Sequence, residues 1–316
     1  MGLTIGSGNF IYDHLDSWQK LPNGMRLIET PGLAVNSIDE VYALTRNTDH
    51  PVMVFDREGT YLRSFGKNVF SNRTHGAMFG PDDTLFCADD GTHTITKWTT
   101  DGELLMTIGT PNVPKPRFSG EPFNKPTHAA ISPNTGDIFI TDGYGNARVH
   151  KFTSSGEYIL SWGEPGIDPG QFLRPHNIVM DSNERIYVAD REAHRVQVFD
   201  TEGDVIEVWN NLYMPDGMTI GPDGNIYIGE LNGLPGMDDA PGLGHRISIL
   251  DQHGNLLARF GDPYEGEEPG KFTAPHSVAV DSHGDIYVGE VSYTIRGSRM
   301  DPPRELRSLS KLVKIN

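Results

Sequence analysis

Four histidines stand at the entrance of short apolar segments that recur along this chain. The segments read "THGAMF", "THAAIS", "PHNIVM" and "PHSVAV", and their histidines are His75, His128, His176 and His276. Fourteen residues after each histidine comes an acidic residue, namely Asp89, Asp142, Asp190 and Glu290. Three imidazoles with one open position form the protein shell of a typical catalytic zinc ion. The recurrence therefore suggests that some of these histidines share a metal.

The segments belong to a longer repeat, with copies that begin near residues 31, 74, 126, 175, 215 and 275. Each copy has a short apolar strand, a turn rich in Asp, Gly and Asn, an alternating strand such as "RIYVAD", a third strand such as "RVQVF", a second turn and a fourth strand. Four-stranded units recurring every 40 to 50 residues or so are typical of β-propeller blades. We expect an all-β, six-bladed β-propeller in a single domain, residues 1–316.

The sixth copy lacks an obvious fourth strand after "SKLVKIN". Residues 10–19, "FIYDHLDSWQ", lie outside the repeats and are expected to close the ring as that strand. Two long insertions, residues 231–245 and 291–308, fall between the second and third strands of the fifth and sixth copies. Loops at equivalent blade positions emerge on one face, so both insertions are expected to overhang one end of the channel. Long irregular loops are either lids or disordered excursions, and the sequence favours lids without deciding between the two.

The first strand of each blade faces the central channel of a propeller. His75, His176 and His276 fall in the second, fourth and sixth copies, whose blades would stand about 120° apart. This symmetry predicts that the three imidazoles converge on one metal and leave a position for water or substrate. His128 and Asp216 hold the same position in the third and fifth copies. The sequence leaves open whether either one joins the metal or bonds to a ligating histidine.

Composition limits the classes of partner. The net charge of −17 argues against nucleic acid, because duplex binding relies on Lys and Arg to neutralise phosphates. A single cysteine, Cys87, excludes an internal disulfide, and no apolar run approaches membrane-spanning length. No cationic, apolar leader opens the chain, so a cytoplasmic protein is expected. The expected partner is a small-molecule substrate. The other histidines, among them His14, His150 and His245, fall mostly in turns or off the register of the repeated histidines and are expected to be solvated. The oligomeric state stays open.

Two stretches carry a resemblance to a known family. "PTHAAISPNTGDIFITDGYGNARVHKFTSSGEYILSWGE" and "PGQFLRPHNIVMDSNERIYVADREAHRVQVF" closely resemble the peptidyl-α-hydroxyglycine α-amidating lyases (peptidylamidoglycolate lyases), which are NHL-type six-bladed propellers. The likeness is densest over residues 120–200, with weaker stretches at residues 65–76 and near the end. It implies a lyase that splits a carbinolamide, R–CO–NH–CH(OH)–COO⁻, into an amide and glyoxylate.

The resemblance also implies roles for individual residues. His75, His176 and His276 match the zinc ligands of the family, although another divalent transition metal would suit the same ligands. Tyr144 matches its catalytic tyrosine, and Arg46 matches the arginine that binds the substrate carboxylate. The residue types suit this chemistry. Zinc is a Lewis acid that acidifies a hydroxyl, tyrosine beside a cation can act as a base, and a guanidinium clamps a carboxylate bidentately.

Some positions depart from the family. Ser277 stands where the family has an Asp tied to a structural calcium, which argues against that calcium and changes the surroundings of the last ligand. His128 replaces another family Asp. No monooxygenase domain precedes the repeats, so a different small carboxylated substrate is open, split by a metal-dependent hydrolase, hydratase or other lyase. A non-catalytic NHL scaffold that binds a protein is the alternative from another class.

Overall fold

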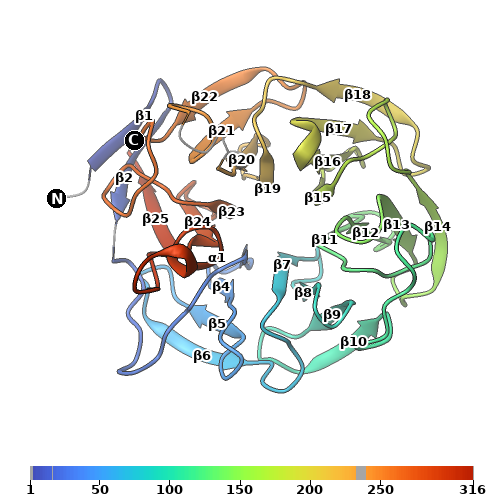
Figure 1. Cartoon of the computed structure of the whole chain (residues 1–316), viewed down its shortest axis with the longest axis horizontal. Helices are drawn as coiled ribbons and strands as arrows, with labels where there is room; N and C mark the ends of the chain where they lie inside the picture. The colour runs from blue at the N-terminus through green and yellow to red at the C-terminus, as the bar shows by residue number, and fades with distance from the viewer. Residues whose placement is uncertain (1–2, 16, 233–239, 316) are drawn as a thin grey trace. The chain divides into compact units, whose positions relative to one another are not determined.

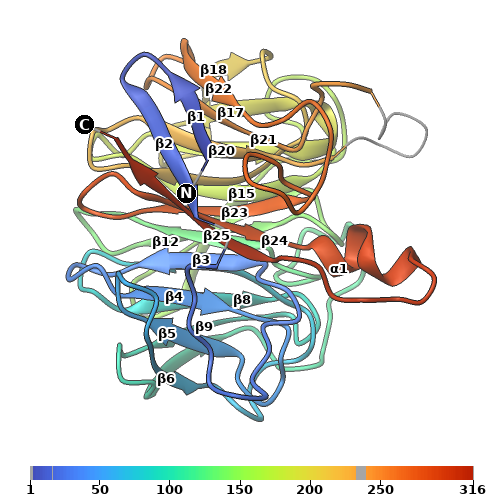
Figure 2. The same ribbon diagram turned by 90° about the vertical axis from the view of Figure 1, so that its left-hand side faces the viewer.

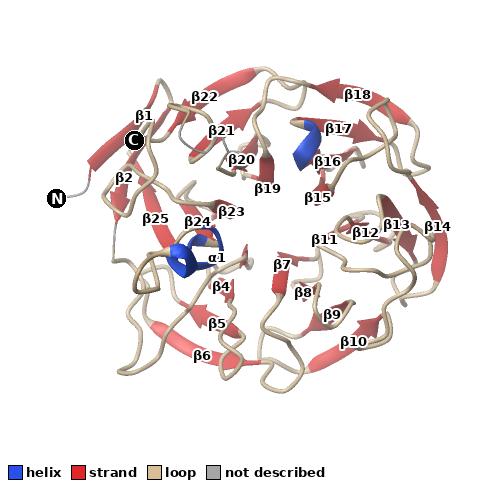
Figure 3. Ribbon diagram, in the orientation of Figure 1, coloured by secondary structure: helices blue, strands red, loops and turns tan. Residues whose placement is uncertain are grey.

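The structure is a computed structural model that describes residues 3–15, 17–232 and 240–315. Within these residues the regular secondary structure is almost all β-strand, with one short α-helix and two 3₁₀ turns (Figures 1 and 3). The 25 described strands form six sheets, one of five strands and five of four. The fold class is the predicted all-β, six-bladed β-propeller.

The chain divides into two compact units, Phe65–Pro215 and Met1–Ser64 with Asp216–Asn316. The assignment of all blades to one domain stays a prediction. Each unit holds three blades. In five of the six sheets the four strands follow one another in chain order, as a meander joined by tight turns.

The Phe65–Pro215 unit contains the second, third and fourth blades. Their innermost strands are neighbours, because β11 packs against both β7 and β15. The 3₁₀ turn η1 (Arg191–Ala193) follows the second strand of the fourth blade. The strands are β7 (Thr74–Phe79), β8 (Leu85–Asp89), β9 (Thr94–Trp98), β10 (Leu104–Ile108), β11 (His128–Ile131), β12 (Ile138–Asp142), β13 (Arg148–Phe152), β14 (Tyr158–Trp162), β15 (Pro175–Met180), β16 (Ile186–Asp190), β17 (Arg195–Phe199) and β18 (Val205–Trp209).

The other unit contains the first, fifth and sixth blades. Its innermost strand β23 packs against β3 and against β20 of the neighbouring blades. The strands are β3 (Gly32–Val35), β4 (Val41–Leu44), β5 (Val52–Phe55), β6 (Tyr61–Phe65), β19 (Pro215–Ile220), β20 (Ile226–Glu230), β21 (Arg246–Leu250), β22 (Leu256–Phe260), β23 (Pro275–Val280), β24 (Ile286–Glu290), β25 (Leu309–Lys314), β1 (Leu3–Ser7) and β2 (Phe10–Leu15).

In blades one, four and six, one acidic or amide side chain bonds the backbone of the turn between the first two strands. In blades four and six, Oδ1 of Asp181 or Asp281 accepts the backbone N–H groups two and four residues later at 2.9–3.0 Å. The following left-handed position takes Gly284 (φ 82°) in blade six and Glu184 (φ 60°) in blade four. Such side-chain bonds to the local backbone explain why Asp, Asn and Gly recur at these positions.

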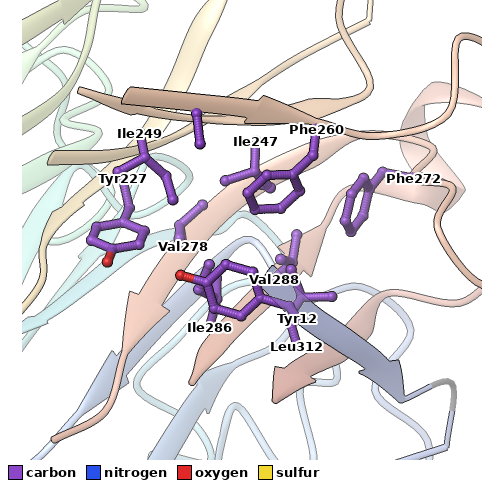
Figure 4. Close-up of a cluster of buried hydrophobic side chains, with 11 residues drawn as sticks. Tyr12, Tyr227, Ile247, Ile249, Phe260, Phe272, Val278, Ile286, Val288 and Leu312 are labelled. Atoms are coloured by element: carbon purple, nitrogen blue, oxygen red, sulfur yellow. The ribbon is translucent and has the colours of Figure 1, made fainter. Parts of the chain in front are cut away.

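The N-terminal strand completes the last blade, as predicted. The sheet order is β1-β2-β25-β24-β23, and β2 pairs antiparallel with β25, Tyr12 opposite Lys314. Tyr12 is fully buried beside Phe260, with ring centroids 5.5 Å apart, and belongs to the core between blades five and six (Figure 4). The strand spans residues 10–15 rather than the expected 10–19, and β1 adds a fifth strand outside it.

The insertion of blade six holds the helix α1 (Ser292–Ile295) and the 3₁₀ turn η2 (Gly297–Arg299). Figure 2 shows α1 beyond the end of β24. In the insertion of blade five, residues 233–239 lie outside the described residues. The role of the two insertions as lids stays a prediction. No helix in the described part of the chain is long and apolar enough to cross a membrane, and the expected cytoplasmic location stays a prediction too.

Candidate active site

The three predicted metal ligands all lie at a β-bulge in the first strand of their blade. Between β15 and β16 the pairing register shifts by one residue at His176. Between β7 and β8 it shifts beyond Thr74, around His75, and between β23 and β24 it shifts at His276. A bulge of this kind bends its strand and re-aims the side chain of the extra residue. The bulges therefore direct the three imidazoles away from the regular pleat.

His128 does not lie at such a bulge. It pairs directly with Thr141, and the register of β11 with β12 is unbroken. The turn after β11 covers residues 132–137, one residue more than the turn 181–185 after β15. The longer turn restores the fourteen-residue spacing that the missing bulge would have supplied. Counted from the turn, His128 matches Asn177 rather than His176, so its predicted equivalence with the other three histidines is wrong.

His128 lies inside the protein, 5% exposed, with Nδ1 3.2 Å from the carbonyl oxygen of Ile178. Burial lowers its pKa to about 4. Its part as a neighbour of a ligand or of substrate stays a prediction. The expectation that the remaining histidines are solvated is wrong for His14, His150 and His245, which are 1%, 0% and 2% exposed.

The acids that follow the histidines position the strand entrance. Oδ1 of Asp190 accepts the backbone N–H groups of Leu173 and Arg174 at 2.9 and 2.8 Å, just ahead of His176. Glu290 does the same ahead of His276, with 2.6 and 2.8 Å bonds from the two residues before Pro275. Burial raises the pKa of both acids. Asp190 and Glu290 therefore support the backbone segment that leads into the histidine.

Hydrogen bonds select which ring nitrogen can bind a metal. Nδ1 of His75 lies 2.8 Å from the carbonyl oxygen of Thr127, and Nδ1 of His276 lies 2.8 Å from that of Pro31. A carbonyl oxygen only accepts, so Nδ1 carries the proton and Nε2 carries the lone pair. Carbonyl oxygens are common partners of ligating imidazoles. These bonds, together with exposures of 2% and 5%, suit both rings for metal binding through Nε2.

Tyr144 meets two of these histidines within the Phe65–Pro215 unit. Its hydroxyl lies 3.2 Å from Nε2 of His75 and 3.0 Å from Nε2 of His176. The two imidazole centroids are 4.7 Å apart, and each ring stands edge-on to the tyrosine. A phenolic oxygen is thus held at the two nitrogens that face the site.

The turn "DGYGN" presents this tyrosine at the end of β12. A Cβ at Gly143 would clash with the carbonyl oxygen of Pro175, and a Cβ at Gly145 would clash with the side chain of Asn124. Only glycine permits such close backbone packing. Gly143 therefore lets the turn lie against β15, and Gly145 lets it lie against Asn124, with Tyr144 between the two glycines and beside His176.

Arginines surround Tyr144, and sequence reasoning missed them. The guanidinium carbons of Arg174 and Arg191 lie 5.0 and 5.6 Å from the tyrosine ring centroid, and Nη1 of Arg191 is 3.4 Å from the hydroxyl. Arg73, paired with Asp90, also interacts electrostatically with Tyr144. One signal was available, because Arg73 and Arg174 both stand two residues before a predicted ligand.

Arg46 lies in the other unit, where its Nη1 pairs with Glu29 at 2.5 Å and its side chain is 13% exposed. Asp216 is fully buried in β19. Ser277 accepts the backbone N–H of Leu33 at 2.8 Å and so joins the sixth blade to the first. This hydrogen bond gives Ser277 a structural role within its unit.

Comparison with known proteins places the chain among relatives. An NHL repeat model matches residues 172–199. The chain is 32% identical over 254 residues to peptidyl-alpha-hydroxyglycine alpha-amidating lyase 1 of Drosophila melanogaster, covering 74% of this chain and 45% of that protein. The resemblance predicted from the sequence is confirmed. The chain is an NHL-repeat homologue of these lyases.

Another relative and a solved structure are also similar to this chain. NHL repeat-containing protein 3 of Homo sapiens is 31% identical over 216 residues, 63% of this chain and 61% of the human protein. The homologue thus spans less than two thirds of these curated relatives. A solved streptogramin B lyase superposes with a TM-score of 0.62 at 14% identity, over 96% of this chain and 97% of the other, which supports the fold alone.

Proposed function

We propose that this protein is a metal-dependent lyase that splits a small carboxylated carbinolamide into an amide and glyoxylate. His75, His176 and His276 would hold the ion, each offering one ring nitrogen. Imidazole nitrogen suits zinc and other divalent transition metals. The observation that carries the proposal is the Tyr144 hydroxyl at hydrogen-bond distance from Nε2 of both His75 and His176.

The metal ligands and Tyr144 have separate roles in the proposed reaction. A divalent ion at the histidines would supply Lewis-acid polarisation of the substrate hydroxyl. Deprotonated Tyr144 takes the hydroxyl proton, the C–O bond becomes a carbonyl and the C–N bond breaks. The electron pair of that bond stays on nitrogen, which receives the proton back from Tyr144 as the amide leaves. Atoms and charge balance, and nothing is oxidised.

The surrounding cations favour this role for tyrosine. Arg174 and Arg191 lie against the Tyr144 ring, and positive charge stabilises a phenolate. Arg46 would bind the substrate carboxylate, because a guanidinium offers a planar pair of donors to two carboxylate oxygens. The lyase names of the homologues agree with this reaction class.

A scaffold without activity is the competing function, favoured by one observation. The human relative at 31% identity is named for its repeats alone. The buried histidine pair and the tyrosine between its nitrogens weigh against this alternative, since a protein-binding scaffold has no use for buried imidazoles that share a phenolic oxygen. A hydrolase, hydratase or other lyase using the same residues on another small carboxylated molecule is the nearer alternative.

The test is metal analysis of the purified protein together with release of glyoxylate from α-hydroxyhippurate. We expect one equivalent of a divalent transition metal and glyoxylate formation that stops when the metal is removed. Metal without glyoxylate would favour another reaction at the same residues. A protein with neither would favour the scaffold.

A further inference from the structure

Arg46 is held by a buried carboxylate. Glu29, whose side chain is 1% exposed, accepts from Nη1 of Arg46 at 2.5 Å, and its backbone carbonyl accepts the Arg46 N–H at 3.1 Å. Glu29 lies just before β3, and Arg46 lies just after β4. The two residues are therefore fixed to each other through side chain and backbone across the entrance of the first blade.

Thr294 closes this contact into a network of three side chains. Its Oγ1 accepts from Nη1 of Arg46 at 2.7 Å and donates to Oε2 of Glu29 at 2.9 Å. Its backbone N–H donates to Oε1 of Glu29. Both hydrogens of Nη1 and both oxygens of Glu29 are thereby engaged. Thr294 belongs to α1, so the insertion of blade six takes part in holding the arginine.

The opposite edge of the Arg46 guanidinium, which carries Nε, has an unsatisfied hydrogen-bond donor in the described part of the chain. Nε of Arg46 is buried and has no hydrogen-bond partner within the described residues. An arginine that serves only a structural ion pair commonly presents two parallel N–H groups to the carboxylate. Here Glu29 and Thr294 together engage a single nitrogen, Nη1. A buried, unsatisfied donor on a cation is costly, which marks the Nε edge as the place for an anionic ligand.

We propose that Glu29 and Thr294 are positioning residues that grip Arg46 by Nη1 and present its Nε–Nη2 edge to the carboxylate of a small N-acylated α-amino acid. The inference rests on the proposed function, in which Arg46 binds the substrate carboxylate. Both residues act through Arg46. They set how strongly the site prefers a carboxylate over a neutral group of the same shape.

The test measures binding by calorimetry to the metal-loaded full chain, with two ligands that cannot be split. Hippurate, which is N-benzoylglycine, carries the carboxylate, and N-benzoylglycinamide is its neutral counterpart. Thr294→Val removes the hydroxyl at constant size, Thr294→Ser restores it, and Glu29→Gln keeps the shape without the charge. We expect Thr294→Val and Glu29→Gln to weaken hippurate binding by about tenfold or more, as for loss of a charge-assisted hydrogen bond.

The expected signature has two further parts. Thr294→Ser should bind hippurate as the wild type does, and all variants should bind the amide equally. Equal hippurate binding by wild type and Thr294→Val would overturn the proposal, as would equal losses for hippurate and amide. Since neither ligand reacts, the outcome is separate from that of the lyase proposal. Discrimination that depends on Thr294, found without glyoxylate release, would keep the positioning role and reject the reaction.

Discussion

At the scale of single residues, Tyr144 separates chemistry from metal binding. Tyr144→Phe keeps the ring against His75 and His176 and removes only the oxygen that lies 3.0–3.2 Å from their nitrogens. If that oxygen is the base, kcat should fall by roughly 10²–10⁴ while metal content stays unchanged. Glyoxylate release and metal analysis measure the two quantities.

The matched control is Tyr158→Phe, because Tyr158 is 52% exposed in the same unit and its hydroxyl donates to Ser161. That variant should turn over normally. Near-normal turnover by Tyr144→Phe would reject tyrosine as the base even with the metal in place.

Residue types and spacing predict part of this site but not all of it. His75 and His176 could be found because the repeat and the family likeness both mark them, and Tyr144 because the family likeness marks it. The structure brings these three together. Arg191 and the contact between Arg46 and Thr294 could not be found. They depend on loops meeting in space, and residues 46 and 294 are joined by no periodic pattern.

At the scale of elements, the repeat made the strands predictable because turn chemistry is local. The bulges were not predictable. A one-residue shift in pairing leaves no mark in the alternation of side chains near a strand end, and in blade three a longer turn compensates for it. His128 therefore has the same fourteen-residue spacing to its acid as the other three histidines, but it lies at a different position in its strand.

Strand β2 carries a stability prediction through Tyr12. The ring is fully buried against Phe260 in the core between blades five and six. Tyr12→Ala leaves a cavity the size of a ring and should lower the free energy of unfolding by about 3–5 kcal/mol. Tyr12→Phe keeps the packing and should cost far less. Urea unfolding measures both, and a loss below about 1 kcal/mol in the alanine variant would show that β2 adds little to its sheet.

The same strand carries a pH prediction through His14, which is 1% exposed and accepts the backbone N–H of Gly270 at Nδ1. Burial, with Arg307 nearby, lowers its pKa to about 4. The unfolded chain takes up the proton near pH 6.5 and the folded chain near 4, so acid favours unfolding between these values. The contribution is complete above pH 6.5 and falls away toward pH 4.

The measurement compares wild type with His14→Gln, which does not titrate. Between pH 6.5 and 4 the wild type should lose up to roughly 3 kcal/mol more of its unfolding free energy than the variant does. Parallel pH profiles for the two proteins would show that His14 is not the group that senses acid.

At the scale of the whole molecule, the proposed metal links the stability of the protein to His75, His176 and His276, the three histidines that could hold it. Metal that binds the folded protein alone should stabilise it by about 4 kcal/mol at a thousand times its Kd. For a chain of 316 residues this raises Tm by roughly 5 °C, and a chelator should reverse the rise. His276→Ala should abolish the chelator effect although His75 and His176 remain. His128→Ala removes an equally buried imidazole outside the bulges, so it should lower Tm and leave the response to chelator intact. Loss of the response in both variants, or in neither, would contradict the assignment of the third ligand to His276.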